Sequence, residues 1–354
     1  MRVTSPLGTR LLEPIGFAFG AVADLRRRWY ATHPSSVRRL LRPVVSVGNL
    51  SVGGSGKTPL VALVATMLRD EGERPAVLSR GYARTRHVDG VVVVRDTEQV
   101  RAGLDSAGDE PFMLARSLDG VVVLVSPDRY LSGTLAEARL GCTVHVLDDG
   151  FQHVRLWRDV DVLIASRSDL QNERVMPAGR LRERPVAARH ADALIVTDVD
   201  PVEATSLGAA AGVRVAFAMR RTLGQPAGPH GESLAIDRSR PVVAVAGTAR
   251  PERFFDDLAG AGWTVAAAVA VGDHHVYTPR DLDRISEAAV TTQAGAVLTT
   301  EKDIVRWPAT YSLPVPLAAV PLAVTVEPAG DFRSWLLGRL AQAHDSSRDR
   351  TDRA

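Results

Sequence analysis

The sequence is poor in cysteine and lysine. Its single cysteine, Cys142, excludes a framework of internal disulfide bonds and is typical of a cytosolic protein. No signal peptide is evident, because the positive charge near the N-terminus follows the first apolar stretch and no Ala-x-Ala cleavage site is present. That apolar stretch contains Glu13 and is too short to cross a bilayer. We therefore expect neither a signal peptide nor a spanning helix.

Only two of the 43 basic residues are lysines, and one of them, Lys57, ends a glycine-rich stretch. A loop that surrounds phosphates requires a point-like cation on a flexible stem, which arginine does not supply. The stretch lies between an apolar run at 43–47 and a helix-like run at 59–68. This strand, loop and helix predict a P-loop whose backbone N–H groups bind a polyphosphate and whose Thr58 hydroxyl binds Mg²⁺.

The loop differs from the strict P-loop pattern, which has glycine where this chain has Ser51. It is closer to the Gly-Gly-x-Gly-Lys-Thr variant. The predicted nucleotide-binding residues are Gly53, Gly54, Ser55, Gly56, Lys57 and Thr58. An acidic motif elsewhere in the chain supports this prediction. Asp148 and Asp149 follow the apolar run 144–147, where carboxylates can bind the Mg²⁺ of a nucleotide. His153 follows closely and is equally consistent with a phosphate contact or a packed histidine.

Four further motifs contain polar residues whose roles their local patterns leave open. Asp109 precedes Glu110 and Pro111, a pattern that by itself favours helix capping. In the second half, His274 and His275 are adjacent, and one of them paired with a carboxylate could accept a proton from a hydroxyl. Spacing alone cannot show whether Asp109 and His274 meet. The charged run 180–184 is either a surface loop or an anion clamp, and the run 299–303 lacks the Asn-Lys-x-Asp order of GTPases.

The charge is unevenly distributed. Residues 1–42 contain eight arginines against Glu13 and Asp24, a local charge of +6 within a net charge of +2, so the remainder is acidic. An acidic body argues against nucleic acid as a partner and points to an anionic surface met by one segment. Apolar residues recur at helical spacing over 11–30, which predicts an amphipathic helix. Its apolar face either lies in a membrane interface beside the arginines or packs on the protein's own core.

The rest of the chain alternates apolar runs with helical stretches, as in a parallel sheet covered on both faces. We expect an α/β protein: a P-loop three-layer α/β/α N-terminal domain and a smaller α/β C-terminal domain around a cleft. The predicted boundaries are a basic, membrane-associating segment at 1–42, the P-loop kinase domain at 43–225, the second α/β domain at 226–342 and a disordered tail at 343–354.

Taken in order, the motifs of residues 10–340 resemble the tetraacyldisaccharide 4′-kinase family of lipid A biosynthesis. They are VGNLSVGGSGKTP (47–59), LSRGY (78–82), GDEP (108–111), PDR (127–129), LDDGFQH (147–153), MPAGRLRE (176–183), GDHHVYT (272–278) and TTEKD (299–303). The resemblance implies transfer of the ATP γ-phosphate to the 4′-hydroxyl of an acylated glucosamine disaccharide 1-phosphate. It also implies a peripheral enzyme on the cytoplasmic face of the bacterial inner membrane, with ATP and Mg²⁺ as cofactors. No obligate protein partner is evident from the sequence.

The resemblance also assigns roles to residues. It places the loop lysine and threonine at Lys57 and Thr58, the Mg²⁺-associated acids at Asp148 and Asp149, and the catalytic aspartate and its partner histidine at Asp109 and His274. Further active-site positions fall on His153, Arg182 and Glu183. The main alternative is a membrane-associated P-loop ATPase that switches or loads partners. Many such proteins carry a second lysine where this chain has Val52, and they need no base for a sugar hydroxyl.

Overall fold

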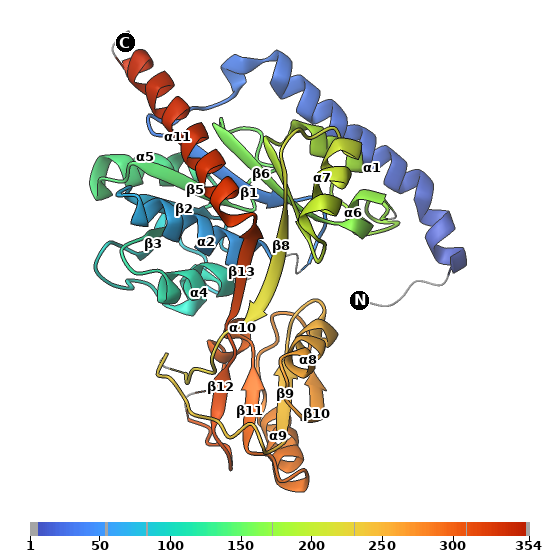
Figure 1. The fold of residues 1–354 in the computed structure, drawn as a ribbon. Helices are drawn as coiled ribbons and strands as arrows, with labels where there is room; N and C mark the ends of the chain where they lie inside the picture. The colour runs from blue at the N-terminus through green and yellow to red at the C-terminus, as the bar shows by residue number, and fades with distance from the viewer. Residues whose placement is uncertain are drawn as a thin grey trace.

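Two sheets organise the chain, a large one of nine strands and a small one of four (Figure 1). The computed structural model describes residues 6–53, 56–82, 84–171, 173–229, 231–308 and 310–351. The large sheet has the order β13-β8-β7-β6-β1-β5-β2-β4-β3. Its strands are β1 (Val44–Asn49), β2 (Pro75–Ser79), β3 (Val92–Arg95), β4 (Val122–Val125), β5 (Val144–Asp148), β6 (Val160–Ser166), β7 (Ala193–Thr197), β8 (Ala216–Leu223) and β13 (Leu322–Glu327).

All neighbouring strands of the large sheet are parallel except at its two edges, where β3 pairs antiparallel with β4 and β13 with β8. The central strands are buried along their whole length, as their continuous apolar sequences predict. The described helices of this unit are α1 (Pro6–Thr32), α2 (Lys57–Asp70), α3 (Leu104–Ala107), α4 (Asp109–Ser117), α5 (Arg129–Leu140), α6 (Arg167–Gln171), α7 (Pro201–Ala210) and α11 (Ala329–Thr351), with 3₁₀ turns η1 (Pro34–Ser36) and η2 (Pro185–His190).

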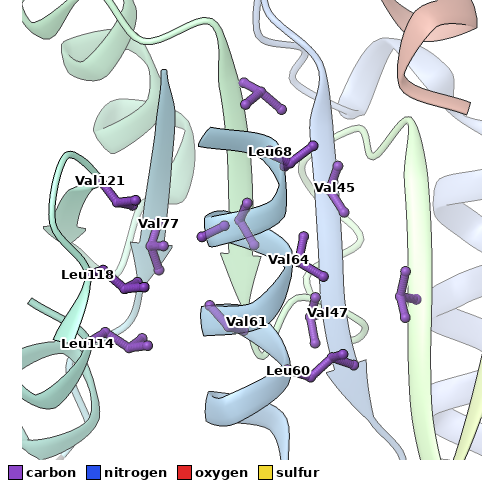
Figure 2. Packing of buried hydrophobic residues seen from close by; sticks show 14 of the residues in the cluster. Val45, Val47, Leu60, Val61, Val64, Leu68, Val77, Leu114, Leu118 and Val121 are labelled. Atoms are coloured by element: carbon purple, nitrogen blue, oxygen red, sulfur yellow. The ribbon is translucent and has the colours of Figure 1, made fainter. Parts of the chain in front are cut away.

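Helix α2, which follows the P-loop, packs against the centre of this sheet. Figure 2 shows its apolar side chains lying between strands β1 and β2. Leu114 of α4, and Leu118 and Val121 after that helix, lie beside Val77 of β2. The labelled residues of this cluster are Val45, Val47, Leu60, Val61, Val64, Leu68, Val77, Leu114, Leu118 and Val121. This packing fixes the start of α2 against the end of β1, and so fixes the geometry of the loop between them.

The small sheet is entirely parallel, with the order β10-β9-β11-β12. Its elements are β9 (Val242–Ala246), α8 (Pro251–Gly260), β10 (Val265–Ala270), α9 (Pro279–Thr291), β11 (Ala296–Thr299), α10 (Glu301–Ile304) and β12 (Leu317–Ala319). Strand β8 runs toward this unit, and β13 returns from it (Figure 1). We call the two units the large lobe and the small lobe.

The end of the chain differs from the prediction in two ways. Strand β13 pairs with β8, and Phe332, Leu336 and Leu340 of α11 join the core of the large sheet, so the residues after Pro321 are not part of the small lobe. The predicted second domain, 226–342, therefore extends too far. The predicted disordered tail is wrong for residues 343–351, which continue α11, with Ala343 buried. Residues 352–354 lie outside the described part of the chain.

Helix α1 lies across one face of the large lobe and packs in an unusual way. Gly16, Gly20 and Arg27 are its buried residues among those whose side chains are described. A Cβ at Gly16 would lie 2.8 Å from the Val175 carbonyl oxygen, so the backbone of α1 approaches the 175–184 segment closely. Its large apolar residues instead face outward, and they include Ile15, Phe17, Phe19, Val22, Leu25 and Trp29. The alternative in which this apolar face packs on the protein's own core is therefore wrong.

Within the described residues, no helix is both long enough and sufficiently apolar to cross a membrane.

Candidate active site

The P-loop joins the end of β1 to the start of α2, as predicted. Gly56 is the N-cap of α2 and has φ +83°, a conformation that residues with a side chain rarely adopt. A Cβ there would also lie 2.9 Å from the Met219 methyl carbon. The predicted loop residues Gly54 and Ser55 lie outside the described residues. The described part places the N-terminus of a helix of 14 residues at the loop, which favours an anion.

Lys57 lies in a network of polar side chains from the ends of β1 and β5 and from the 180–184 segment. Its Nζ donates to Asn49 Oδ1 at 3.0 Å and lies 3.4 Å from Asp149 Oδ1. Arg182 donates to the other oxygen of Asp149 at 2.5 Å. Burial alone would raise the pKa of Asp149, but Lys57 and Arg182 outweigh it and hold the pKa below its ordinary value. Asp149 is therefore ionised and its charge is balanced by two cations.

Asp148, the last residue of β5, has a different environment. Its Oδ2 accepts a hydrogen bond from Ser79 at 2.9 Å, whereas its buried Oδ1 has no hydrogen-bond partner among the described residues. Burial, together with the charges of Glu110 and Asp149, raises the pKa of Asp148 to about 7. A buried carboxylate oxygen without a partner, beside a second carboxylate and the Thr58 hydroxyl, is suited to a hard divalent cation.

No cluster of three or more potential ligands among His, Cys, Asp and Glu was found in the described parts of the chain. This does not conflict with the predicted ligands Thr58, Asp148 and Asp149. Mg²⁺ in nucleotide sites is commonly bound by one or two carboxylates, with water and phosphate oxygens as the remaining ligands. The residues present therefore fit Mg²⁺ bound together with a nucleotide.

Asp109 and His274 meet across the two lobes. Asp109 is the first residue of α4 in the large lobe, His274 follows β10 in the small lobe, and His274 Nδ1 lies 2.6 Å from Asp109 Oδ2. His275 instead contacts Asp281 at 2.8 Å, which resolves the choice between the two histidines in this structure. His274 has φ +61°, a strained conformation that is often found at functional sites.

The environment of His274 favours its neutral form. Burial and, to a smaller extent, the positive charge of Lys302 lower the pKa of His274, against the opposing effect of Asp273. Its Nε2 lies 3.8 Å from Asp273 Oδ1, and Lys302 donates to that same oxygen at 2.7 Å. Lys302, the second lysine of the chain, thus supports Asp273. An imidazole that is neutral at pH 7 is able to accept a proton.

A cavity of about 900 Å³ connects these groups. It lies between the lobes and is lined by Lys57, Thr58, Asp148 and Asp149 from one side and by Asp273, His274 and Lys302 from the other. Asp109 is 3% exposed and lies behind His274 rather than on the cavity wall. The arrangement places a polyphosphate-binding loop and a carboxylate–imidazole pair in one enclosed space, as a group transfer from a nucleotide to a hydroxyl requires.

The three supporting residues have different positions. His153 lines the cavity, and burial together with Arg129 and Arg158 lowers its pKa to about 4. Arg182 also lines it, through its contact with Asp149. Glu183 does not: it is buried and accepts two hydrogen bonds of 2.9 Å from Arg27. Glu183 therefore holds helix α1. Arg27 is bound inside the protein, whereas the prediction placed the arginines of the N-terminal segment at a membrane interface.

Sequence reasoning missed several polar residues around the site. Asn49 ends β1 directly before the loop, a position that could have identified it as a lysine partner. Arg306 donates from Nε to Asp109 Oδ1 at 2.7 Å, although it lies 197 residues away in the sequence. It follows α10 without any local motif of its own, so no sequence signal pointed to it.

Comparisons with known proteins identify the family of the chain. A family model described as tetraacyldisaccharide-1-P 4′-kinase matches residues 8–341. The tetraacyldisaccharide 4′-kinase of Geobacter metallireducens is 40% identical over 299 residues, which cover 84% of this chain and 88% of that protein. The one from Geobacter sulfurreducens is 40% identical over 323 residues, covering 89% of each.

A solved structure is similar over nearly the whole chain. It is the "apo" form of LpxK from Aquifex aeolicus in complex with ATP, with a TM-score of 0.76 and 30% identity, covering 94% of this chain and 99% of that one. The likeness confirms the predicted α/β class with a P-loop kinase fold.

Proposed function

This chain belongs to the tetraacyldisaccharide-1-P 4′-kinase family, and on that premise we propose how its own residues carry out the reaction. It is an ATP-dependent kinase of lipid A biosynthesis that transfers the γ-phosphate to the 4′-hydroxyl of tetraacyldisaccharide 1-phosphate. The alternative of a P-loop ATPase that switches partners is not favoured. The proposal concerns the roles of individual residues, the metal and the membrane surface.

On the nucleotide side, Lys57 and the N-terminus of α2 bind the ATP phosphates. Thr58, Asp148 and Asp149 would hold Mg²⁺, which would supply positive charge to neutralise the phosphates. Arg182 keeps Asp149 in place through their contact at 2.5 Å. The support for a metal is Asp148 Oδ1, which lies beside a second carboxylate and has no hydrogen-bond partner within the described part of the chain.

His274, which lines the cavity, accepts the proton of the sugar hydroxyl through Nε2. Asp109 accepts the hydrogen bond from Nδ1, and so fixes the tautomer that leaves a lone pair on Nε2. Asp109 itself is enclosed behind the ring, so we assign it an orienting role. The observation that carries the assignment is the 2.6 Å contact between the two lobes at the wall of the cavity that also contains Lys57.

We further propose that the protein binds the surface of the membrane that contains its substrate, on the cytoplasmic face. An acyl chain gains about 0.8 kcal/mol for each buried CH₂, so a substrate with four chains stays in the bilayer and the kinase has to come to it. The exposed apolar residues of α1, such as Phe17 and Leu25, together with the exposed Arg28 and Arg42, suit an anionic interface.

Mass analysis of an acylated disaccharide 1-phosphate incubated with ATP, Mg²⁺ and the protein tests the reaction. We expect the product to gain one phosphate and ATP consumption to depend on the lipid. Lys57→Ala serves as the inactive control. Rapid ATP hydrolysis without lipid and without phosphorylated product would instead support the switch ATPase.

A further inference from the structure

The geometry points to Arg306 as a positioning residue that holds the Asp109 carboxylate against His274 and keeps a positive charge beside the imidazole. Arg306 Nε donates to Asp109 Oδ1 at 2.7 Å, and its Nη2 contacts Asp109 Oδ2. The same Nη2 lies 2.8 Å from His274 Nδ1. One guanidinium thus contacts both members of the pair. This role rests on the proposed function, in which His274 is the base.

The contact between Arg306 and Asp109 is buried. The side chain of Arg306 is 7% exposed and that of Asp109 is 5% exposed, so neither has an alternative partner in bulk water. Arginine can occupy both oxygens of a carboxylate with its planar fork, which restricts the rotation of the carboxylate. Asp109 is therefore held in one orientation, with Oδ2 directed at the imidazole. Two side chains, Arg306 and His274, therefore fix the orientation of the carboxylate.

The location of Arg306 adds a second element to the argument. Asp109 belongs to the large lobe, whereas His274 and Arg306 both belong to the small lobe. The two small-lobe residues bind the same carboxylate, which reaches them from α4. The carboxylate can be held in this way only while the lobes are together. Arg306 consequently links formation of the Asp109–His274 contact to the closed arrangement of the lobes.

The third element is competition at His274 Nδ1. This nitrogen is within hydrogen-bond distance of a carboxylate, which only accepts, and of a guanidinium, which only donates. It therefore donates to Asp109 or accepts from Arg306, but not both. Once His274 has taken a proton on Nε2, only the bond to Asp109 remains possible. A cation beside Nδ1 disfavours that charged form, and so keeps the imidazole neutral and able to accept a proton before the transfer.

Other charges also act on His274, and Tyr82 contacts its ring with centroids 5.4 Å apart. The charged or titratable groups that face it from the packed elements are Asp109, Glu110, Asp273, Lys302, Asp303 and Arg306. Asp273 is already paired with Lys302 at 2.7 Å, and Asp303 accepts from Thr300 and from the Gly247 backbone. Arg306 is the cation among these groups that contacts Nδ1.

Two substitutions separate geometry from charge. Arg306→Met removes both, and we expect kcat to fall about 100-fold. The acid limb of the kcat/KM profile should move up by about one pH unit, because the pKa of His274 rises without the cation. Arg306→Lys keeps the charge without the fork, so about a tenfold loss in kcat with an unmoved acid limb is expected. The KM for ATP should stay within about threefold in both.

The control is Arg116→Met. Arg116 also joins the large lobe to the segment before the small sheet, donating to the Pro229 carbonyl oxygen at 2.5 Å, but it does not line the cavity. Its loss should leave kcat within about threefold of the unsubstituted protein. Melting temperature and ATP affinity of every variant report whether the fold is intact.

A double substitution provides the decisive measurement. If Arg306 acts through Asp109, Asp109→Asn/Arg306→Met will be no slower than Asp109→Asn alone, within about threefold. Multiplicative losses, or Arg306→Met with nearly normal kcat and an unmoved acid limb, would overturn this role. Full activity of Asp109→Asn would instead remove the proposed function of the pair, so the two failures are distinguishable.

Discussion

The two sides of the cavity are constructed differently. The nucleotide side, consisting of Lys57, Thr58, Asp148 and Asp149, comes entirely from the large lobe, at the ends of β1 and β5 and the start of α2. The opposite side, the Asp109–His274 pair, comes from both lobes and joins residues 165 positions apart. The first is fixed by the packing of a single sheet, whereas the second exists only when the lobes meet. ATP binding and phosphoryl transfer should therefore be separable by substitution.

Substituting Asp109 and Lys57 gives the largest expected effects and tests this separation directly. Asp109→Asn keeps the size of the side chain but no longer selects the tautomer of His274, so we expect kcat to fall about 1,000-fold or more. The dissociation constant for ATP, measured by calorimetry, should change less than about threefold, because Asp109 lies behind the cavity wall. Lys57→Ala should instead weaken ATP binding.

Asp105→Asn is the matched control, since Asp105 is exposed and lies four residues before Asp109. It should behave like the unsubstituted protein in both measurements. Loss of ATP binding in Asp109→Asn would contradict the separation, because it would show that the pair also organises the nucleotide side.

Helix α1 supplies the second prediction, an effect on membrane binding rather than on the chemistry. Ile15 and Leu25 are 56% and 68% exposed and do not contact the cavity. Each contributes on the order of 1 kcal/mol or more if it is buried in the interface, so Ile15→Ser/Leu25→Ser should lower partition into anionic vesicles about 10- to 100-fold. Activity on a detergent-solubilised substrate should change little.

The control replaces two apolar residues of similar exposure elsewhere, Val202 on α7 and Val290 on α9, with serine. Cosedimentation with vesicles of zwitterionic and of anionic lipid measures both variants. Equal binding of the α1 variant and its control would refute a docking role for the helix.

The same contrast between local and distant contacts explains what the sequence could predict. The P-loop and the two acids at the end of β5 follow from local patterns, because a strand end, a turn and a helix start are encoded by adjacent residues. Continuous apolar runs likewise predicted the parallel sheets. The resemblance to a known family then supplied Asp109, whose local sequence pointed only to a helix cap.

Other features depend on contacts that no local pattern records. Arg306 and Glu183 obtain their roles from residues far away in the chain, Asp109 and Arg27 respectively. Strand β13 returns to the large sheet because the edge beside β8 is available to it. The alternating burial of β13 would fit either lobe, so its sequence pattern does not select one. The buried glycines of α1 could be recognised as its packing surface only once the 175–184 segment lay against them.

A smaller effect is expected for the pH dependence of metal binding. The pKa of Asp148 is raised to about 7, so its carboxyl group is largely protonated at pH 6 and ionised at pH 8. Since Mg²⁺ requires the ionised form, its affinity in the presence of ATP should rise about tenfold over this range, with release of a proton. Calorimetry in buffers of different ionisation enthalpy measures both quantities.

Asp148→Asn is the control for this titration, because it retains the shape without the ionisable group. Its weaker metal binding should be nearly independent of pH between 6 and 8. An unchanged pH dependence in that variant would assign the titration to another group.

The smallest expected effect concerns His153, which tests whether the nucleotide side is also a stability determinant. Burial, Arg129 and Arg158 lower the pKa of His153 to about 4 from its ordinary 6.5. Between these values the unfolded chain binds a proton that the folded one does not, so the stability that is complete above pH 6.5 is lost as the pH falls toward 4. His153→Gln removes this pH-dependent contribution to stability. Between pH 7 and pH 4.5 the melting temperature of the variant should fall less than that of the unsubstituted protein. The difference should be a few degrees, which corresponds to about 1 kcal/mol of unfolding free energy. Parallel melting curves for the two proteins across this range would mean that the imidazole is protonated as readily in the folded state as in water.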